Sequence, residues 1–221
     1  MDLCSVALPV AWTIAGWTAT LPLLAWAVHR APWGRFHAGE LAHVWFGAIF
    51  CSVVLWNIQA TVGEGFTAHL LGSAAFTLVA GPALALVGSA IAVALLIGVR
   101  GGLWINGGIV FATMVAVPVA VAAATQVFTR RRLPPNLFVY LFVGGFFGGA
   151  LALGAAAIAG AAALAFGAGV SPSLVFGEYA PYFLYLAFGE ATLTGMVLTM
   201  LVVYRPQWVA TFDDAHYLQD R

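Results

Sequence analysis

His69 is the residue of this sequence whose type and setting best suit a metal ion. It follows Gly63-Glu64-Gly65 and begins a long apolar stretch. A neutral imidazole is the commonest metal ligand in proteins, and nickel, cobalt, copper and zinc all bind it. A histidine that only forms a hydrogen bond at the start of a helix would look the same in sequence, so the choice between the two depends on its neighbours.

Further possible ligands are expected on the same outer face as His69. They are Glu64 together with Met1, Asp2 and Cys4 of the amino-terminal segment, and Asn57 and Asn106 are expected in the surroundings on the same face. A Cys4 thiolate would favour Cu(I) or zinc, whereas Asp2 with His69 would suit nickel or cobalt less selectively. Binding through His69 is expected to weaken as the pH falls through the ordinary imidazole pKa of about 6.5, because protonation removes the lone pair that the metal needs.

Glu190 is the deepest carboxylate of the predicted membrane segments. Ionisable groups inside a membrane are costly and are therefore candidates for function. Glu190 could bind a cation, relay a proton, or anchor helices by accepting hydrogen bonds from Thr or Asn neighbours. The anchoring role is favoured, with the proton relay as the lesser alternative.

The remaining histidines and the tryptophans suggest no further site. His37 and His43 flank Glu40 at a spacing that matches no metal motif, so they are expected to be solvated or interfacial. Tryptophans near predicted helix ends are expected to anchor the protein at the membrane–water interface rather than to form a binding cage: Trp45, Trp56 and Trp104.

Several classes of activity are excluded by motifs that the sequence lacks. It contains no Walker A sequence, GxSxG, HExxH or Gly-rich phosphate loop, so ATP hydrolysis within this chain is excluded. Paired carboxylates and a nucleophile next to a base are also missing, and an enzyme is not expected. Cys4 and Cys51 are too few and too far apart for a disulfide framework or a CxxC metal pair.

The elements that must position His69 and Glu190 are membrane helices. Of the 221 residues 63% are hydrophobic and only 7% are charged, whereas soluble domains carry about 25% charged residues. The formal net charge is zero and the only basic run is Arg130-Arg131-Arg132, so a nucleic-acid partner is excluded. The whole chain, 1–221, is predicted to be a single integral membrane domain within the lipid bilayer.

Apolar runs bounded by charges, Pro and Gly predict an all-α, polytopic bundle of about seven transmembrane helices. The spans are expected near 7–28, 41–62, 65–80, 83–99, 108–128, 137–166 and 181–204. Only Gly81-Pro82 divides the third span from the fourth, and both are short for a bilayer, so tilt or local thinning is implied.

Arginine positions predict the orientation, because cytoplasmic loops are enriched in basic residues. With the N-terminus outside, every arginine except Arg100 lies on the cytoplasmic side. The inner (plasma) membrane is the expected location. The first apolar run is not expected to be a cleaved signal peptide. The C-terminal tail, 205–221, is expected to be cytoplasmic and solvated, including Asp213-Asp214.

Two segments are rich in small residues, which let helix backbones approach closely. Gly144–Gly169 is expected to be a tightly packed helix inside the subunit. The stripe of Ala11, Ala15 and Ala19 on the first helix could dock a partner subunit or pack internally, and internal packing is favoured.

Three segments in order resemble the CbiM family, the substrate-capturing integral membrane component of cobalt and nickel energy-coupling-factor transporters. The first is Gly65-Phe66-Thr67-Ala68-His69-Leu70-Leu71-Gly72 with the later Gly81-Pro82. The second is Gly101-Gly102-Leu103 followed by Gly107, Val110-Phe111 and Pro118. The third is Gly189-Glu190-Ala191 with Thr194, Val197 and Arg205-Pro206.

The resemblance implies a fold in which the extreme N-terminus plugs into the bundle from outside. It also implies a metal held by the N-terminal amine, here that of Met1, a histidine at position 2, and the histidine of the His-Leu-x-Gly segment, here His69. Position 2 is Asp2, and Ile109 and Ala112 stand where the family has Asn. This sequence therefore resembles a divergent branch in which only His69 is retained as a ligand.

The chain is expected to be the substrate-binding membrane component of an energy-coupling-factor-like importer whose cargo is a transition-metal ion such as Ni, Co or Cu. No tightly bound cofactor is expected. A transmembrane coupling protein and cytoplasmic ATPase subunits would be separate chains. The alternative is a non-transporting integral membrane subunit of a larger complex, which uses the same bundle for helix packing only.

Overall fold

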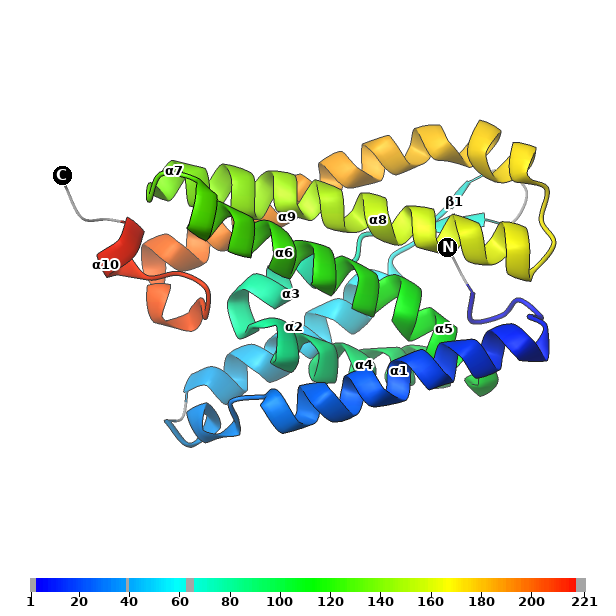
Figure 1. The fold of residues 1–221 in the computed structure, drawn as a ribbon, viewed down its shortest axis with the longest axis horizontal. Coiled ribbons are helices and arrows are strands. Elements are labelled where there is room, and N and C mark those ends of the chain that lie inside the picture. Colours follow the sequence, from blue (N-terminus) through cyan, green and yellow to red (C-terminus); the bar gives the residue numbers. More distant parts are fainter. Residues whose placement is uncertain (1–2, 39, 63–65, 218–221) are drawn as a thin grey trace.

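The computed structural model describes residues 3–38, 40–62 and 66–217. Its long helices run side by side along the length of an elongated bundle (Figure 1). Within the described residues, five helical stretches are long and apolar enough to cross a membrane: Val10–Arg30, Pro82–Arg100, Trp104–Arg132, Leu137–Gly167 and Tyr182–Tyr204. A shorter apolar helix covers Leu41–Asn57. The protein is a multi-pass helical membrane protein, which confirms the predicted fold class.

The elements follow one another with few long loops. The longer helices are α1 (Val10–Arg30), α2 (Glu40–Asn57), α3 (Ser73–Ala80), α4 (Pro82–Arg100), α6 (Val117–Arg132), α8 (Gly148–Ala162) and α9 (Ala180–Tyr204). Short helical pieces are η1 (Trp33–Ala38), η2 (Trp104–Asn106), α5 (Gly107–Phe111), η3 (Ala112–Ala116), α7 (Leu137–Val139), η4 (Tyr140–Phe147), η5 (Ala163–Gly167), η6 (Leu174–Tyr179), η7 (Pro206–Trp208) and α10 (Asp214–Tyr217). Most of these pieces extend a longer helix, so that 104–132 and 137–167 each form one continuous rod.

Five predicted spans agree with helical stretches of the structure to within four residues at each end: 7–28, 83–99, 108–128, 137–166 and 181–204. The predicted break at Gly81-Pro82 is also confirmed. Gly81 has φ +88°, a conformation that residues with a side chain rarely adopt, and Pro82 begins α4.

The second and third predicted spans, 41–62 and 65–80, need correction. α2 ends at Asn57, and β1 (Ala60–Val62) then pairs antiparallel with β2 (Phe66–Ala68). α3 has only eight residues, about 12 Å of rise against a hydrocarbon core of about 30 Å. The third crossing is therefore a strand, an extended segment and a half-length helix. Non-helical backbone at this depth is tolerated where protein surrounds it.

The inner face of α1 packs on α5 through glycine rather than alanine. A Cβ on Gly16 would lie 2.5 Å from the backbone nitrogen of Ile109, and the Thr20 hydroxyl donates a hydrogen bond of 2.9 Å to the Gly108 carbonyl. The alanine stripe, Ala11, Ala15 and Ala19, lies on the exposed side of the same helix. The favoured prediction of internal packing for that stripe is wrong, because Gly16 allows the closer backbone approach.

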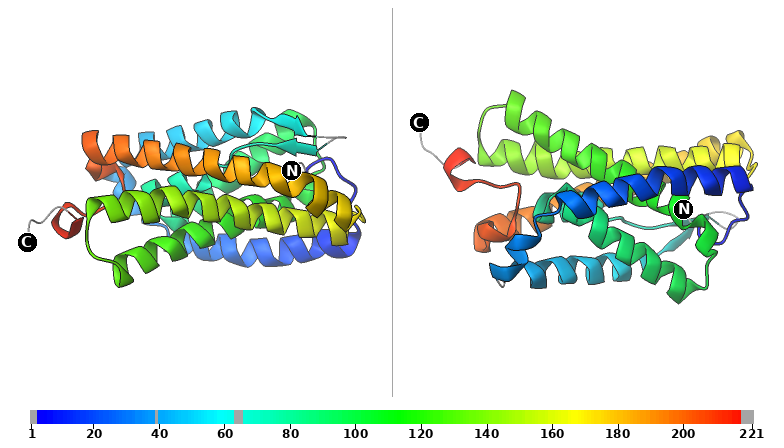
Figure 2. Two further views of the ribbon diagram at one scale, coloured as in Figure 1. Left: turned by 90° about the horizontal axis from the view of Figure 1, so that it is seen from above. Right: turned by 60° about the horizontal axis from the view of Figure 1, so that its bottom comes forward.

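The small-residue segment of 144–169 is packed inside the subunit, as predicted. A Cβ on Gly145 would lie 2.9 Å from the Leu198 side chain, and one on Gly149 would lie 2.9 Å from the Thr194 hydroxyl. Figure 2 shows α8 lying along α9 over most of its length. Because Gly145 and Gly149 have no side chain, the larger side chains of α9 fit against this helix.

The segment after α9 is not the solvated tail that the sequence predicted. The backbone N–H groups of Ala210 and Thr211 donate to the carbonyls of Val79 and Leu78, and the Thr211 hydroxyl bonds both Leu78 O and the Tyr140 hydroxyl. Tyr217 is buried. The last carbonyls of α3 need donors from elsewhere, and this segment supplies them. Asp213 itself is exposed and lies 3.9 Å from Arg130.

The tryptophans predicted as interface anchors behave differently from one another. Trp45 and Trp56 are 5% and 0% exposed, and their indole N–H groups donate to the carbonyls of Leu84 and Leu71. Only Trp104 is largely exposed. The anchor assignment is wrong for the first two, because each satisfies a backbone carbonyl inside the bundle.

The two ends of the bundle match the predicted distribution of charge. The carboxyl ends of α1, α6 and α9, which carry or adjoin Arg30, Arg130–Arg132 and Arg205, gather at one end, and that of α4, with Arg100, lies at the other (Figures 1 and 2). The Arg100 guanidinium donates to the Trp56 carbonyl and so ties the end of α4 to the end of α2. Arg100, the one arginine predicted on the outer side, thus has a structural role. The orientation of the protein in the membrane stays a prediction.

Candidate functional site

A cavity of about 40 Å³ lies beside His69, between the extended segment after β2 and the helices behind it. Its lining comprises Ala68, His69 and Leu71, Leu3 of the amino-terminal segment, Thr113 and Met114 of η3, Phe183 and Leu186 of α9, and Leu153, Ala156, Ala157 and Gly160 of α8. A water molecule needs about 10–15 Å³ by this measure, whereas organic ligands occupy pockets of about 300 Å³ or more. The cavity therefore suits an ion or a few water molecules.

His69 is buried, and one of its ring nitrogens is oriented by a backbone carbonyl. The side chain is 8% exposed, and Nδ1 lies 3.1 Å from the Leu70 carbonyl oxygen. Since a carbonyl can only accept, Nδ1 carries the proton in this hydrogen bond. Histidines that ligate metals are commonly oriented through such a bond from the other ring nitrogen.

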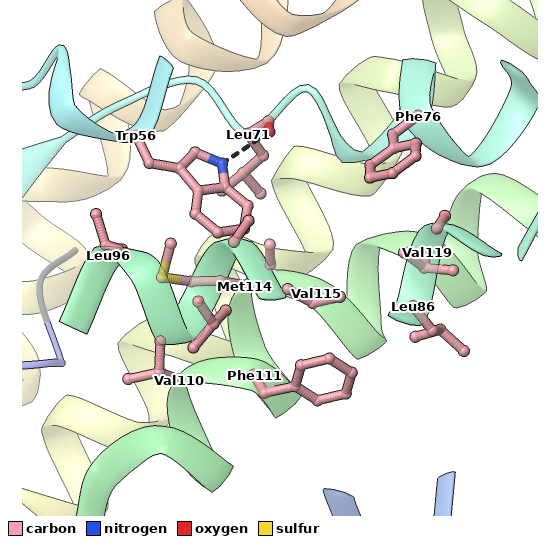
Figure 3. Packing of buried hydrophobic residues seen from close by; sticks show 14 of the residues in the cluster. Trp56, Leu71, Phe76, Leu86, Leu96, Val110, Phe111, Met114, Val115 and Val119 are labelled. Carbon is pink, nitrogen blue, oxygen red and sulfur yellow. Dashed lines mark hydrogen bonds between the residues drawn. The ribbon is translucent and has the colours of Figure 1, made fainter. Parts of the chain in front are cut away.

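The backbone that presents His69 is held by side chains from two other helices. Trp56 of α2 donates its indole N–H to the Leu71 carbonyl at 2.8 Å, as the dashed line in Figure 3 shows. Glu190 of α9, also fully buried, accepts the Leu71 N–H at 2.8 Å. The predicted anchoring role of Glu190 is confirmed, although its partner is a backbone N–H group instead of Thr or Asn.

The amino-terminal segment enters the bundle beside the cavity. Leu3 and Cys4 are each 1% exposed. Asn106, fully buried, donates to the carbonyls of Leu3 and Val6 at 2.8 and 2.7 Å, and the Leu103 N–H donates to the Cys4 carbonyl at 2.8 Å. The expected insertion of this segment into the bundle is therefore present from Leu3 onward.

Of the predicted ligands, the structure places His69 at the cavity, and it does not bring Cys4 to it. Met1, Asp2 and Glu64 lie outside the described residues. Cys4 packs against Gly102 and is not among the described residues that line the cavity, and it forms no disulfide with Cys51, the other described cysteine. Asn57 is exposed and bonds its own helix at Val53, and His43 is exposed. Across 3–38, 40–62 and 66–217, no three His, Cys, Asp or Glu side chains converge as a metal cluster.

Sequence reasoning missed Trp56, Thr113 and Met114. Thr113 and Met114 lie in η3, a π-helical turn within the rod of 104–132, and such turns are frequent at functional sites. This turn has no recognisable pattern in the sequence. Figure 3 shows Trp56 above the helix that carries Met114 and Val115. The pairing of Trp56 with Leu71, fifteen residues further on, depends on the hairpin that reverses the chain.

The family model and the solved structures that this chain resembles all concern cobalt or transition-metal transport. Residues 5–208 match the family model described as cobalt uptake substrate-specific transmembrane region, CbiM. The fold is similar to a crystal structure of a transition metal transporter, with TM-score 0.76, 16% identity, and 91% of this chain and 92% of that chain covered. It is also similar to a truncated transition metal transporter, with TM-score 0.71, 18% identity, and 92% and 99% covered. Among curated proteins, none matches the sequence significantly.

Proposed function

The chain belongs to the CbiM family of cobalt uptake transmembrane regions, and on that basis we propose that it captures a transition-metal ion for import. The ion enters the cavity beside His69 from the outer face and is bound by the imidazole. The family is one of membrane transporter components and not of enzymes.

The observation that carries this proposal is the buried imidazole against a small, ion-sized cavity. His69 is 8% exposed, its Nδ1 proton is directed to a backbone carbonyl, and the cavity beside it measures about 40 Å³. Leu3 forms part of the wall, and the segment that contains it is fixed by Asn106. A histidine that only stabilised a helix start would need no such cavity.

The lining favours an ion that accepts nitrogen and soft donors. Apart from His69, the lining residues with possible donor atoms are Met114, with its thioether, and Thr113, whose hydroxyl already bonds the Ile109 carbonyl. Imidazole suits nickel, cobalt, copper and zinc, while thioether favours Cu(I). We therefore propose Ni, Co or Cu as cargo. The contributions of Met1, Asp2, Cys4 and Glu64 stay predictions.

Energy and coupling would come from other chains of an energy-coupling-factor-like importer in the inner membrane. This sequence has no nucleotide-binding motif, so the ATPase subunits are separate. The outward-facing stripe of Ala11, Ala15 and Ala19 offers a close approach for a helix of the transmembrane coupling protein.

Metal titration of the purified protein tests the proposal. Wild type, His69→Ala and His43→Ala would each be titrated with Ni²⁺, Co²⁺ and, under reducing conditions, Cu⁺, and bound metal would be measured by mass spectrometry. His43 is the matched control because it is exposed on α2. We expect binding to the wild type and His43→Ala and at least tenfold weaker binding to His69→Ala. Equal metal content in all three folded proteins would refute the assignment and favour the non-transporting subunit.

A further inference from the structure

We propose that Glu190 is a positioning residue for the metal site, which acts through the backbone of Leu71. The inference rests on the proposed function, because it assigns a role in presenting His69 to a residue outside the cavity. Glu190 lies on α9, 119 positions from Leu71 in the chain, and its carboxylate accepts the Leu71 N–H at 2.8 Å.

The backbone around Leu71 has no secondary structure to hold it. Residues 69–72 lie between the end of β2 and the start of α3, and Gly72, with φ +66°, has no side chain that could cap the helix. The N–H groups that precede a helix must find other acceptors, because an unpaired donor inside an apolar interior is costly. Glu190 supplies the acceptor at this point, where the positive end of the α3 dipole also favours a negative charge.

Four contacts together fix the short segment that carries His69. The Leu71 N–H is bound by Glu190 and the Leu71 carbonyl by Trp56, so one peptide plane on each side of that residue is held by a side chain from a different helix. The Leu70 side chain lies 3.2 Å from the point where a Cβ of Gly189 would be. The Nδ1 of His69 is in turn bonded to the Leu70 carbonyl.

Loss of the hydrogen bond to Glu190 or of the one from Trp56 should therefore displace the imidazole of His69, because His69 is only two residues from Leu71. If Leu71 moves, the Leu70 carbonyl moves with it, and the hydrogen bond that orients His69 changes length and direction. Groups that orient a metal ligand without touching the metal commonly contribute 10- to 100-fold to affinity. The structure thus links α9 to the cargo site through one carboxylate.

The test compares variants that lose the hydrogen-bond acceptor for the Leu71 N–H with variants that keep it. Glu190→Leu removes the acceptor at similar size, Glu190→Gln keeps an amide oxygen that can accept the Leu71 N–H, and Trp56→Phe removes the donor on the other side. Thr194→Val is the matched control, because Thr194 is one turn further along α9, fully buried, and its hydroxyl has no partner among the described residues. Each protein is titrated with Co²⁺, and its visible absorption spectrum is recorded at saturation.

We expect Glu190→Leu and Trp56→Phe to bind Co²⁺ at least tenfold more weakly and with an altered spectrum. Glu190→Gln and Thr194→Val should stay within about threefold of wild type. Hydrogen exchange of a peptide that covers 66–76, measured without metal, should be faster in Glu190→Leu than in Thr194→Val. If Glu190→Leu does not fold, Trp56→Phe with Glu190→Gln still decides the question.

The outcomes separate this proposal from the proposed function. Wild type that binds Co²⁺ while Glu190→Leu and Trp56→Phe bind it equally well, with unchanged spectra, would overturn the positioning role and leave metal capture intact. Less Co²⁺ bound per protein at saturation, with an unchanged dissociation constant and spectrum, would also overturn it, since that result reports only fewer folded sites. Wild type that binds no Ni²⁺, Co²⁺ or Cu⁺ would refute metal capture, and the positioning role with it.

Discussion

Replacement of Gly16 by alanine should destabilise the bundle far more than the size of one methyl group suggests. The new Cβ would lie 2.5 Å from the Ile109 nitrogen and 2.9 Å from the Gly108 carbonyl carbon. Both contacts are with backbone, which cannot rotate away, and Cβ contacts below 3.0 Å are essentially never seen. α1 and α5 must therefore move apart by at least about 0.5 Å, a gap that already forfeits about a quarter of each dispersion contact.

The expected cost can be worked out from two terms. Forced insertion of a methyl group into a packed interface costs about 1–3 kcal/mol. Separation of the helices also stretches the hydrogen bond from Thr20 to the Gly108 carbonyl, which is worth about 0.5–1.5 kcal/mol. Gly16→Ala should therefore lose about 2–4 kcal/mol of unfolding free energy.

The assay is reversible unfolding in mixed micelles, followed by circular dichroism, with Gly154→Ala as the control. Nothing lies within 4 Å of a Cβ at Gly154, which is also helical. That variant should be neutral or more stable by about 0.5–1 kcal/mol, because alanine loses less backbone entropy than glycine in a helix. Equal unfolding free energies for Gly16→Ala and Gly154→Ala would show that α1 and α5 are not in backbone contact.

Ala15, which precedes Gly16 and is exposed, gives a contrasting prediction. Ala15→Leu should abolish co-purification with a transmembrane partner and leave the unfolding free energy of the isolated subunit nearly unchanged. Unfolding of this variant would show that the alanine stripe packs internally. Metal affinity measured by titration between pH 8 and pH 5 should fall as the pH decreases through about 6.5, because protons compete for His69, and a flat profile would argue against an imidazole ligand. Thr211→Val removes a hydroxyl that bonds the Leu78 carbonyl and the Tyr140 hydroxyl, so chymotrypsin cleavage after the adjacent Phe212 should become faster; an unchanged rate would contradict docking of this segment. A reporter enzyme fused after Arg221 should be active only in the cytoplasm, and activity only outside would reverse the predicted orientation.

Local properties of the sequence were sufficient to predict the membrane class and most helix positions. Apolar runs between charged or Pro-Gly breaks determine where α1, α4, α8 and α9 lie, because a segment in hydrocarbon must satisfy its own backbone and therefore becomes helical. The break at Gly81-Pro82 was predictable for the same reason, since proline cannot donate to the preceding turn. His69 and Glu190 were identifiable as candidates because polar side chains are rare in such a sequence.

Only the tertiary structure decided how the third crossing is built. Residues 65–80 are apolar enough to suggest a helix, yet Leu71 is held by Glu190, 119 positions away, and by Trp56 across the hairpin. The same holds for the C-terminal segment, which is bonded to α3 at Leu78, 133 positions from Thr211. Hydrogen bonds over such separations replace those that a local helix would make. A pattern confined to neighbouring residues cannot reveal them, because the partners become neighbours only when the bundle has assembled.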